Sequence, residues 1–336
     1  MALALFVVVC VLTAGFTVFN GLRDAPSTVA VAVRTRALTP TIAVILAAFF
    51  NLVGALFSGA FAATLGDQLF VLSPGTAGLA VLIAALVAAL LWGLYQWWLG
   101  FPSSSTHALI GGIAGASVAA MIKGEQPPSG LVEAVIWLVV LPLLISPVVA
   151  FLLSYLVVFP LAWLSRYAQP NNINRRFRRV QGIAASAVAF GHGLQDGSRV
   201  AALMLFAISA LGIGLPDESI WWVVAAAGVL LTAGTLIGGW RIAYTLANRL
   251  VRVDPLRGLV AQSVSAVMLF VGGFGLHLPL ATTQLTTAAI VGAGANQRFA
   301  TSNARLSGKI ALSWLLTPAC CAVAGGIFYL ALTPLF

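Results

Sequence analysis

Charged side chains are scarce in this chain. Of its 336 residues, 7% are charged and 61% are hydrophobic, and the mean hydropathy is +1.04. A water-soluble domain carries about 25% charged residues, so a soluble globular protein is excluded. The apolar runs are far longer than the roughly ten-residue strands of a membrane barrel, and they do not alternate. The sequence therefore predicts an all-α polytopic membrane protein, in which each helix satisfies its own backbone groups in lipid.

The signatures of several other protein classes are also missing. The three cysteines, Cys10, Cys320 and Cys321, lie in apolar segments without metal-ligand or disulfide spacing, so free thiols are expected. The chain has no nucleotide-binding loop and no nucleophile–base arrangement, which argues against a primary pump and against an enzyme. No cofactor is predicted. The net charge of +9 comes from arginines between apolar runs, which is typical of membrane topology rather than of nucleic-acid binding.

Two aspartates lie inside membrane-length apolar sequence in matching settings, Gly-Leu-Arg-Asp at 21–24 and Gly-Leu-Gln-Asp at 193–196. A charge near the bilayer centre costs roughly 2.5–3.5 kcal/mol or more, and each aspartate has an arginine nearby. Glycines and Pro26 predict discontinuous helices here, with free carbonyls that suit Na⁺ or a proton relay. The alternative is that each aspartate only caps a helix or pairs with a structural arginine. The predicted coupling-ion residues are Asp24, Ser27, Asp196 and Ser198, with Asp24 and Asp196 as candidate Na⁺ ligands.

Two hydroxyl-rich runs follow prolines, Ser-Ser-Ser-Thr at 103–106 and Thr-Thr at 282–283. This pattern favours a helix N-terminus, where free N–H groups and the positive end of the helix dipole attract an anion. Two such ends that meet would hold a tetrahedral oxyanion from both sides. The alternative is ordinary capping and small-residue helix packing. The predicted substrate-binding residues are Ser104, Ser105, Thr106, Thr282, Thr283, Arg23 and Arg199.

These features recur in the same order at nearly constant spacing. Asp24 and Asp196 lie 172 residues apart, and Pro102 and Pro279 lie 177 apart. The order predicts a first repeat at 1–165, a basic linker at 166–180 and a second repeat at 181–336. About five crossings per repeat would make the second copy enter the membrane from the opposite side, and such inverted-topology repeats are typical of secondary transporters.

The arginines orient the predicted crossings. The central linker is the most basic segment, so it is expected to be cytoplasmic, with both termini external. Two of the expected crossings, at 103–121 and 280–296, are short enough to be arms of re-entrant hairpins. The others are expected at 3–20, 40–61, 76–98, 131–161, 181–211, 220–243, 258–276 and 309–333. The residues expected inside include Arg34, Arg36 and Arg298, those expected outside are Asp67, Glu125, Asp217 and Glu218, and His277 is expected at the interface.

Taken together, these motifs resemble those of the PiT family of inorganic phosphate transporters. The resemblance spans nearly the whole chain and implies cation-coupled phosphate uptake by alternating access in the plasma membrane. It implies that the aspartates lie near the coupling cations and that the Ser/Thr hairpins contact the anion. The matching residues are Gly21, Asp24 and 36–39 for the first signature, Phe190, 192–193 and Asp196 for the second, Pro102, 104–107, Pro279 and 282–283 for the hairpins, and 308–310 with 313–314 for the closing helix.

The chain also departs from that family pattern. Arg23 replaces an Asn or His, Ser27 replaces an Asn, Arg199 replaces an Asn or Lys, and Gln284 replaces a His. Two carboxylates and a divalent phosphate require positive charge at low dielectric. The hypothesis is that Arg23 and Arg199 supply two fixed positive charges, which predicts a proton-coupled or weakly Na⁺-dependent symporter.

Two alternatives remain at this level, a permease for sulfate or another oxyanion and a non-transporting membrane receptor or scaffold. An ionised aspartate favours phosphate over sulfate, because HPO₄²⁻ carries a proton donor that sulfate lacks. The expected partners are inorganic phosphate and membrane lipid, with no nucleic acid. A homo-oligomer and a cytoplasmic regulatory partner are left open. His192 is a better titrating candidate than His107, for which a structural role is expected.

Overall fold

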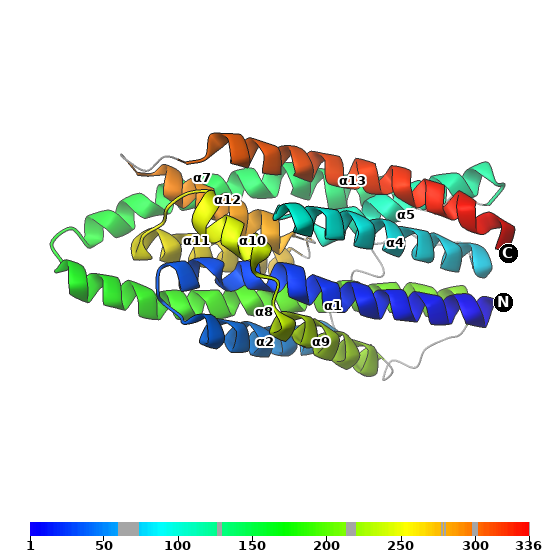
Figure 1. Cartoon of the computed structure of the whole chain (residues 1–336), viewed down its shortest axis with the longest axis horizontal. Helices are drawn as coiled ribbons and strands as arrows, with labels where there is room; N and C mark the ends of the chain where they lie inside the picture. Colours follow the sequence, from blue (N-terminus) through cyan, green and yellow to red (C-terminus); the bar gives the residue numbers. More distant parts are fainter. Residues whose placement is uncertain are drawn as a thin grey trace.

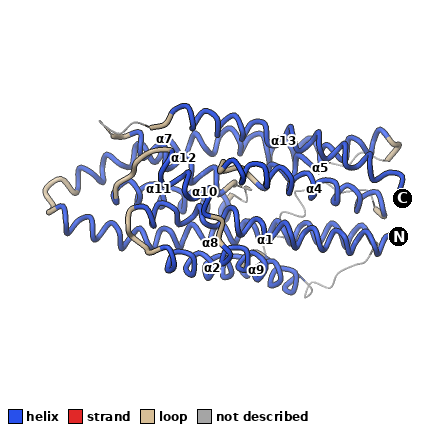
Figure 2. Tube along the Cα trace, in the orientation of Figure 1, coloured by secondary structure: helices blue, strands red, loops and turns tan. Residues whose placement is uncertain are grey.

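The structure is a computed structural model that describes residues 1–59, 74–125, 130–212, 220–276, 278, 280–297 and 302–335. Asp67, Asp217, Glu218, His277, Pro279 and Arg298 lie outside the described residues. The described part is a bundle of helices joined by loops, with no strand (Figure 2). Its helices are α1 (Ala2–Arg34), α2 (Pro40–Leu56), α4 (Thr76–Leu99), α5 (Ser105–Ile122), α6 (Leu131–Val135), α7 (Leu141–Leu164), α8 (Pro170–Ala210), α9 (Ile220–Ile237), α10 (Trp240–Tyr244), α11 (Pro255–Met268), α12 (Thr282–Ala295) and α13 (Ala304–Leu332). The π-helical segments η1 (Ile136–Val140), η3 (Thr245–Arg249) and η4 (Leu269–Gly275) continue α6, α10 and α11, and a 3₁₀ turn η5 (Thr333–Leu335) follows α13.

The prediction of an all-α polytopic membrane protein is confirmed. Within the described residues, six helices are long and apolar enough to cross a membrane. A seventh is reached when α9 and the α10–η3 segment, bent by 59°, count as one broken span. Both chain termini lie at one end of the bundle, and the connection from α7 to α8 lies at the other (Figure 1).

The connection between α7 and α8 is shorter than the predicted linker at 166–180. Only residues 165–169 separate the two helices, because α8 begins at Pro170, a residue well suited to a first helical turn. The basic residues at 175–179 therefore lie on the first turns of α8.

Two helical hairpins point toward each other from opposite ends of the bundle. The arm α4 enters from the end that holds the termini, turns at 100–104, and returns as α5 (Figure 1). The arm formed by α11 and η4 enters from the other end and returns as α12. The turn of the first hairpin uses Gly100 with φ of 71°, a left-handed conformation that favours glycine. The segments expected at 103–121 and 280–296 are thus the returning arms of hairpins.

The prediction of discontinuous helices at the two aspartates is wrong. Helix α1 runs unbroken through Asp24 and Pro26, and α8 runs unbroken through Asp196. Proline removes one backbone donor, but nearby hydroxyls bond the helix's own carbonyls. Ser27 donates to the carbonyl of Asp24 at 2.5 Å, and Thr28 donates to that of Ala25 at 2.7 Å. Tight burial of this stretch then holds the helix together.

Close backbone contacts cross-link the first and second halves of the chain. A Cβ on Gly21 of α1 would lie 2.1 Å from the carbonyl oxygen of Leu231 on α9. On α8, a Cβ on Gly193 would lie 2.1 Å from the carbonyl oxygen of Asn51 on α2. Only glycine lets helices approach so closely in lipid. The two aspartate-bearing helices are therefore fixed by the same kind of contact, each against a helix of the other half.

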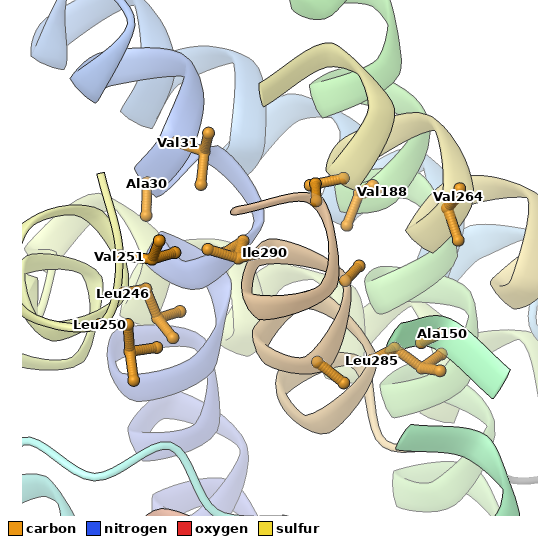
Figure 3. Packing of buried hydrophobic residues seen from close by; sticks show 14 of the residues in the cluster. Ala30, Val31, Ala150, Val188, Leu246, Leu250, Val251, Val264, Leu285 and Ile290 are labelled. Carbon is orange, nitrogen blue, oxygen red and sulfur yellow. The ribbon is translucent and has the colours of Figure 1, made fainter. Parts of the chain in front are cut away.

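An apolar cluster packs the far end of α1 against the second half. Ala30 and Val31 of α1 face Leu246 and Val251, and Ile290 of α12 lies beside them (Figure 3). This cluster fixes α12, and with it the tip of the second hairpin, relative to α1.

Candidate functional site

The tips of the two hairpins touch. The hydroxyl of Thr283 on α12 donates to the carbonyl oxygen of Ser103 at 3.1 Å. The next residue of α12, Gln284, has its Nε2 3.4 Å from Nδ1 of His107 in the first turn of α5. The indole of Trp314 on α13 donates to the carbonyl of Pro102 at 2.6 Å and holds the first tip from behind. The two helix N-termini that the sequence predicts as anion-binding ends therefore meet inside the bundle.

The first turns of the two returning helices differ in how they are capped. Ser104 caps α5, and its hydroxyl accepts from the backbone N–H of His107 at 3.1 Å. Ala281 precedes α12 and has no side-chain oxygen to offer the first-turn N–H groups. The hydroxyl of Thr282 is buried and has no hydrogen-bond partner among the described residues. Both features leave donors available at the tip of the second hairpin.

A small polar cavity lies where the tips meet the two aspartate-bearing helices. It leaves about 10 Å³ for the centre of a water molecule, roughly the space for one water. The site is therefore closed in this conformation. Its lining comes from α1, α8 and both hairpin tips, and consists of Asp24, Ser104, Ser105, His192, Asp196, Arg199, Ala281, Thr282 and Thr283.

The charges around the cavity are paired. Arg23 donates two hydrogen bonds to Asp24, from Nε at 2.8 Å and from Nη2 at 2.6 Å. Arg199 donates to Oδ1 of Asp196 one helical turn away. All four side chains are nearly or fully buried, with at most 10% of any of them exposed. Two carboxylates and two guanidinium groups sum to zero formal charge, which keeps the buried site electrically neutral.

Asp196 is the most connected acidic group of the site. Its Oδ2 accepts a hydrogen bond from the amide of Asn20 on α1 and lies 3.3 Å from Nε2 of His192. The other ring nitrogen of His192, Nδ1, lies 3.0 Å from the side-chain oxygen Oδ1 of Asn51 on α2. These contacts tie α1, α2 and α8 to a single carboxylate.

Arg199 also joins α8 to the tip of the second hairpin. Its Nη2 donates to the carbonyl of Leu280 at 2.8 Å. Gln195 on the preceding turn donates to the carbonyl of Leu278 at 3.2 Å. The pairing of Asp196 with Arg199 and the position of the second hairpin are therefore linked through one guanidinium group.

The structure brings seven of the predicted site residues to the cavity and leaves four away from its lining. Those that line it are Asp24, Asp196, Arg199, Ser104, Ser105, Thr282 and Thr283. Arg23 lies behind Asp24 and reaches Ser103, and the buried hydroxyl of Thr106 has no hydrogen-bond partner in the described part of the chain. Ser27 and Ser198 each donate to a carbonyl three residues back in their own helices.

Sequence reasoning missed two asparagines of the site. Asn20 is four residues before Asp24 and so on the same helix face, which was a usable signal. Its hydrogen bond nevertheless goes to Asp196, in the other half of the chain. Asn51 lies in an apolar helix of its own, and nothing in the local sequence links it to His192. Only the packing of α2 against α8 brings Asn51 and His192 together.

A helical membrane bundle with a closed polar cavity, lined by helix N-termini and by paired charges, defines a membrane transport protein. The chain belongs to the phosphate transporter family, whose model it matches over residues 20–325.

Relatives and a solved structure agree with this assignment. The chain is 35% identical over 320 residues to a probable low-affinity inorganic phosphate transporter of Rhizobium meliloti (strain 1021), which covers 94% of this chain and 93% of the relative. It is 32% identical over 339 residues to a protein of Bacillus subtilis (strain 168) with the same description, covering 100% and 99%. A solved structure titled "The sodium-dependent phosphate transporter" has the same fold, with a TM-score of 0.83 at 20% identity over 99% of this chain and 100% of that one. The resemblance inferred from the motifs is confirmed.

Proposed function

We propose that this protein is a symporter that carries inorganic phosphate across the membrane by alternating access. The observation that supports this proposal most strongly is the cavity where two opposed helix N-termini meet, whose lining includes both Asp24 and Asp196. Hydroxyls and backbone N–H groups at these ends suit a tetrahedral oxyanion. A phosphate ion is several times larger than one water molecule, so it enters only when the tips of the hairpins separate.

The charge balance supports coupling to a cation. With both aspartates paired to arginines, the site is neutral before phosphate enters. A phosphate mono- or dianion would leave it negative at low dielectric, and one or two entering cations restore neutrality. Each carboxylate oxygen already accepts a hydrogen bond from Arg23, Arg199 or Asn20. These engaged oxygens leave few free lone pairs to coordinate Na⁺, so the proposed coupling ion is a proton.

Transport assays in proteoliposomes test the proposal directly. An inward proton gradient without Na⁺ is expected to drive accumulation of radiolabelled phosphate, and added Na⁺ is expected to raise the rate less than about twofold, because the arginines already occupy the carboxylates. Arsenate should compete and sulfate should not. Strict dependence on Na⁺ with no response to the proton gradient would refute proton coupling, and full competition by sulfate would refute phosphate as the substrate.

Replacing Thr282 by Val tests the anion site at the second hairpin. A hydrogen bond to a charged group contributes about 1.5–3 kcal/mol, so kcat/KM for phosphate should fall about ten- to hundredfold. Thr282→Ser keeps the hydroxyl at the same position and should retain most of the activity. Retained activity in Thr282→Val together with a loss in Thr282→Ser would mean that packing of the methyl group, rather than donation by the hydroxyl, matters at this position.

The two halves of the chain are further proposed to be inverted repeats at 1–165 and 181–336. The opposed hairpins and the equivalent glycine contacts of α1 and α8 support this relation. The basic start of α8 supports a cytoplasmic location for the α7–α8 connection, which puts both termini outside.

A further inference from the structure

A second cavity, lined by both polar and apolar side chains, lies at the C-terminal end of α1, far from the two chain termini (Figure 1). It has a volume of about 330 Å³ between α1 and the α10–η3 segment. Arg34 and Arg36 line one side, and Trp240, Tyr244 and Asn248 line the other. The floor is apolar and includes Ala30, which belongs to the buried cluster of Figure 3. None of these residues takes part in the phosphate cavity.

The two arginines of this pocket are unpaired. Within the described residues, neither makes an ion pair or donates a side-chain hydrogen bond, and the pocket lining contains no carboxylate. By contrast, Arg23, Arg199 and Arg257 all form ion pairs. The second pocket therefore presents two positive charges without an acidic partner, and this charge favours an anion as its ligand.

The remaining walls indicate which kind of anion fits. A guanidinium group recognises phosphate oxygens in a bidentate geometry. Tyr244 is 61% exposed and stands with Trp240 beside an apolar floor, and such amphipathic aromatic residues are enriched at membrane interfaces. Basic pockets between transmembrane helices bind anionic lipid headgroups. A phospholipid has groups for both parts of the pocket. Its phosphate can contact the arginines, and its glycerol and acyl carbons can contact the apolar floor.

We propose that this pocket binds the phosphate group of an anionic phospholipid, with Arg34 and Arg36 as its charged ligands. Free inorganic phosphate offers the same charged group but leaves the apolar floor and the aromatic wall uncovered. The pocket is large enough for a headgroup and the first carbons of its chains.

A bound lipid would also support the first hairpin. The α10–η3 segment that forms one wall also contacts the end of α4 and the first residue of the hairpin turn. Arg241 donates to the carbonyl of Trp98 at 3.1 Å, and a Cβ on Gly100 would lie 3.0 Å from the Thr245 hydroxyl. A lipid that orders this wall therefore stabilises the turn that precedes the substrate-binding end of α5.

The test compares two double variants of the full chain purified in detergent. Arg34→Gln with Arg36→Gln removes the proposed ligands, and Arg175→Gln with Arg176→Gln removes the same charge from exposed positions on α8. Binding of phosphatidylglycerol is measured by native mass spectrometry and by the shift in thermal unfolding temperature. From the typical contribution of two basic side chains near an anionic surface, the first variant should bind phosphatidylglycerol about thirtyfold more weakly. The control should bind like the unmodified chain.

Two further arms identify the source of the phosphate group. Phosphatidylcholine should give no stabilisation that depends on Arg34 and Arg36, and neither should inorganic phosphate. Arg34→Lys with Arg36→Lys should keep most of the phosphatidylglycerol binding, because the charge is retained. Equal losses in the two glutamine variants, or equal binding of phosphatidylcholine, would overturn the site. Stabilisation by inorganic phosphate through the same arginines would overturn the assignment to a lipid.

Discussion

Asp196→Asn is expected to reduce phosphate uptake at least about a hundredfold and to destabilise the protein. The change removes the charge that Arg199 pairs with in a site where the two side chains are 3% and 10% exposed. Removing one partner of a buried ion pair typically costs about 3–5 kcal/mol, because the other charge stays buried and uncompensated. The freed Arg199 also holds the carbonyl of Leu280, so the second hairpin tip should shift with it. Uptake in proteoliposomes and thermal unfolding in detergent measure the two effects.

A second substitution separates the structural effect from the functional one. Asp196→Asn combined with Arg199→Gln removes both charges and should recover most of the lost stability, since neutral partners leave no buried ion. Transport should stay as low as in Asp196→Asn, because the site then lacks both the carboxylate and an anchor for the hairpin. Recovery of transport in the double variant would show that the pair is structural only.

Asp254→Asn is the matched control for this experiment. Asp254 and Arg257 form an ion pair with the same spacing of three residues, but their side chains are 44% and 20% exposed. Asp254 also caps α11 by accepting from the N–H of Arg257 at 2.9 Å, and asparagine caps a helix equally well. This variant should therefore lose less than about 1 kcal/mol of stability and keep most of its uptake. A loss as large as that of Asp196→Asn would contradict the importance of burial.

Gly21→Ala is expected to disrupt folding and transport together. The added Cβ would lie 2.1 Å from the carbonyl oxygen of Leu231 and 3.1 Å from the backbone nitrogen of Thr235. These are backbone atoms that cannot rotate away, so α1 and α9 must separate. Overpacking of this kind costs about 1–3 kcal/mol or more. Because Asn20 and Asp24 lie on the same stretch of α1, the separation also displaces the site, and uptake should fall at least about tenfold.

Gly15→Ala is the same substitution on the same helix, where a Cβ would meet no atom within 4 Å. It should change stability by less than about 1 kcal/mol, because alanine favours the helix. Thermal unfolding of the two variants, followed by uptake assays, compares them directly. If Gly21→Ala and Gly15→Ala behaved alike, the close crossing of α1 and α9 would be wrong.

Much of the fold followed from simple physical constraints on the sequence. The low charge and long apolar runs required helices in lipid, and this prediction is confirmed. The ordered repetition of aspartate and hydroxyl motifs indicated the phosphate transporter family, whose model matches residues 20–325. The same motifs named seven residues that line the cavity. Such features can be recognised from the local sequence alone. A charge within an apolar run predicts a buried polar site, and a proline before hydroxyl residues predicts a helix N-terminus, whatever the rest of the chain does.

The errors came from properties that depend on neighbours in space. Glycine and Pro26 predicted broken helices at the aspartates, yet burial and back-bonding hydroxyls keep α1 continuous. The break occurs instead between α9 and α10, where Gly238 has a left-handed φ of 69°. Local helix propensity cannot predict where a helix breaks, because tertiary packing contributes more free energy than a single proline or glycine removes.

The sequence by itself determined a helical membrane protein, its family, and the types of residue that meet at its centre. Only the tertiary structure decided which partners those residues take. In the folded protein, Asn20 of the first half donates a hydrogen bond to Asp196 of the second, and Asn51 contacts His192. Arg199 donates to a backbone carbonyl at the tip of the second hairpin. The physical reason is that hydrophobicity and charge act at each residue, whereas a hydrogen bond requires two groups within about 3 Å. That distance is set by how helices far apart in the sequence pack together.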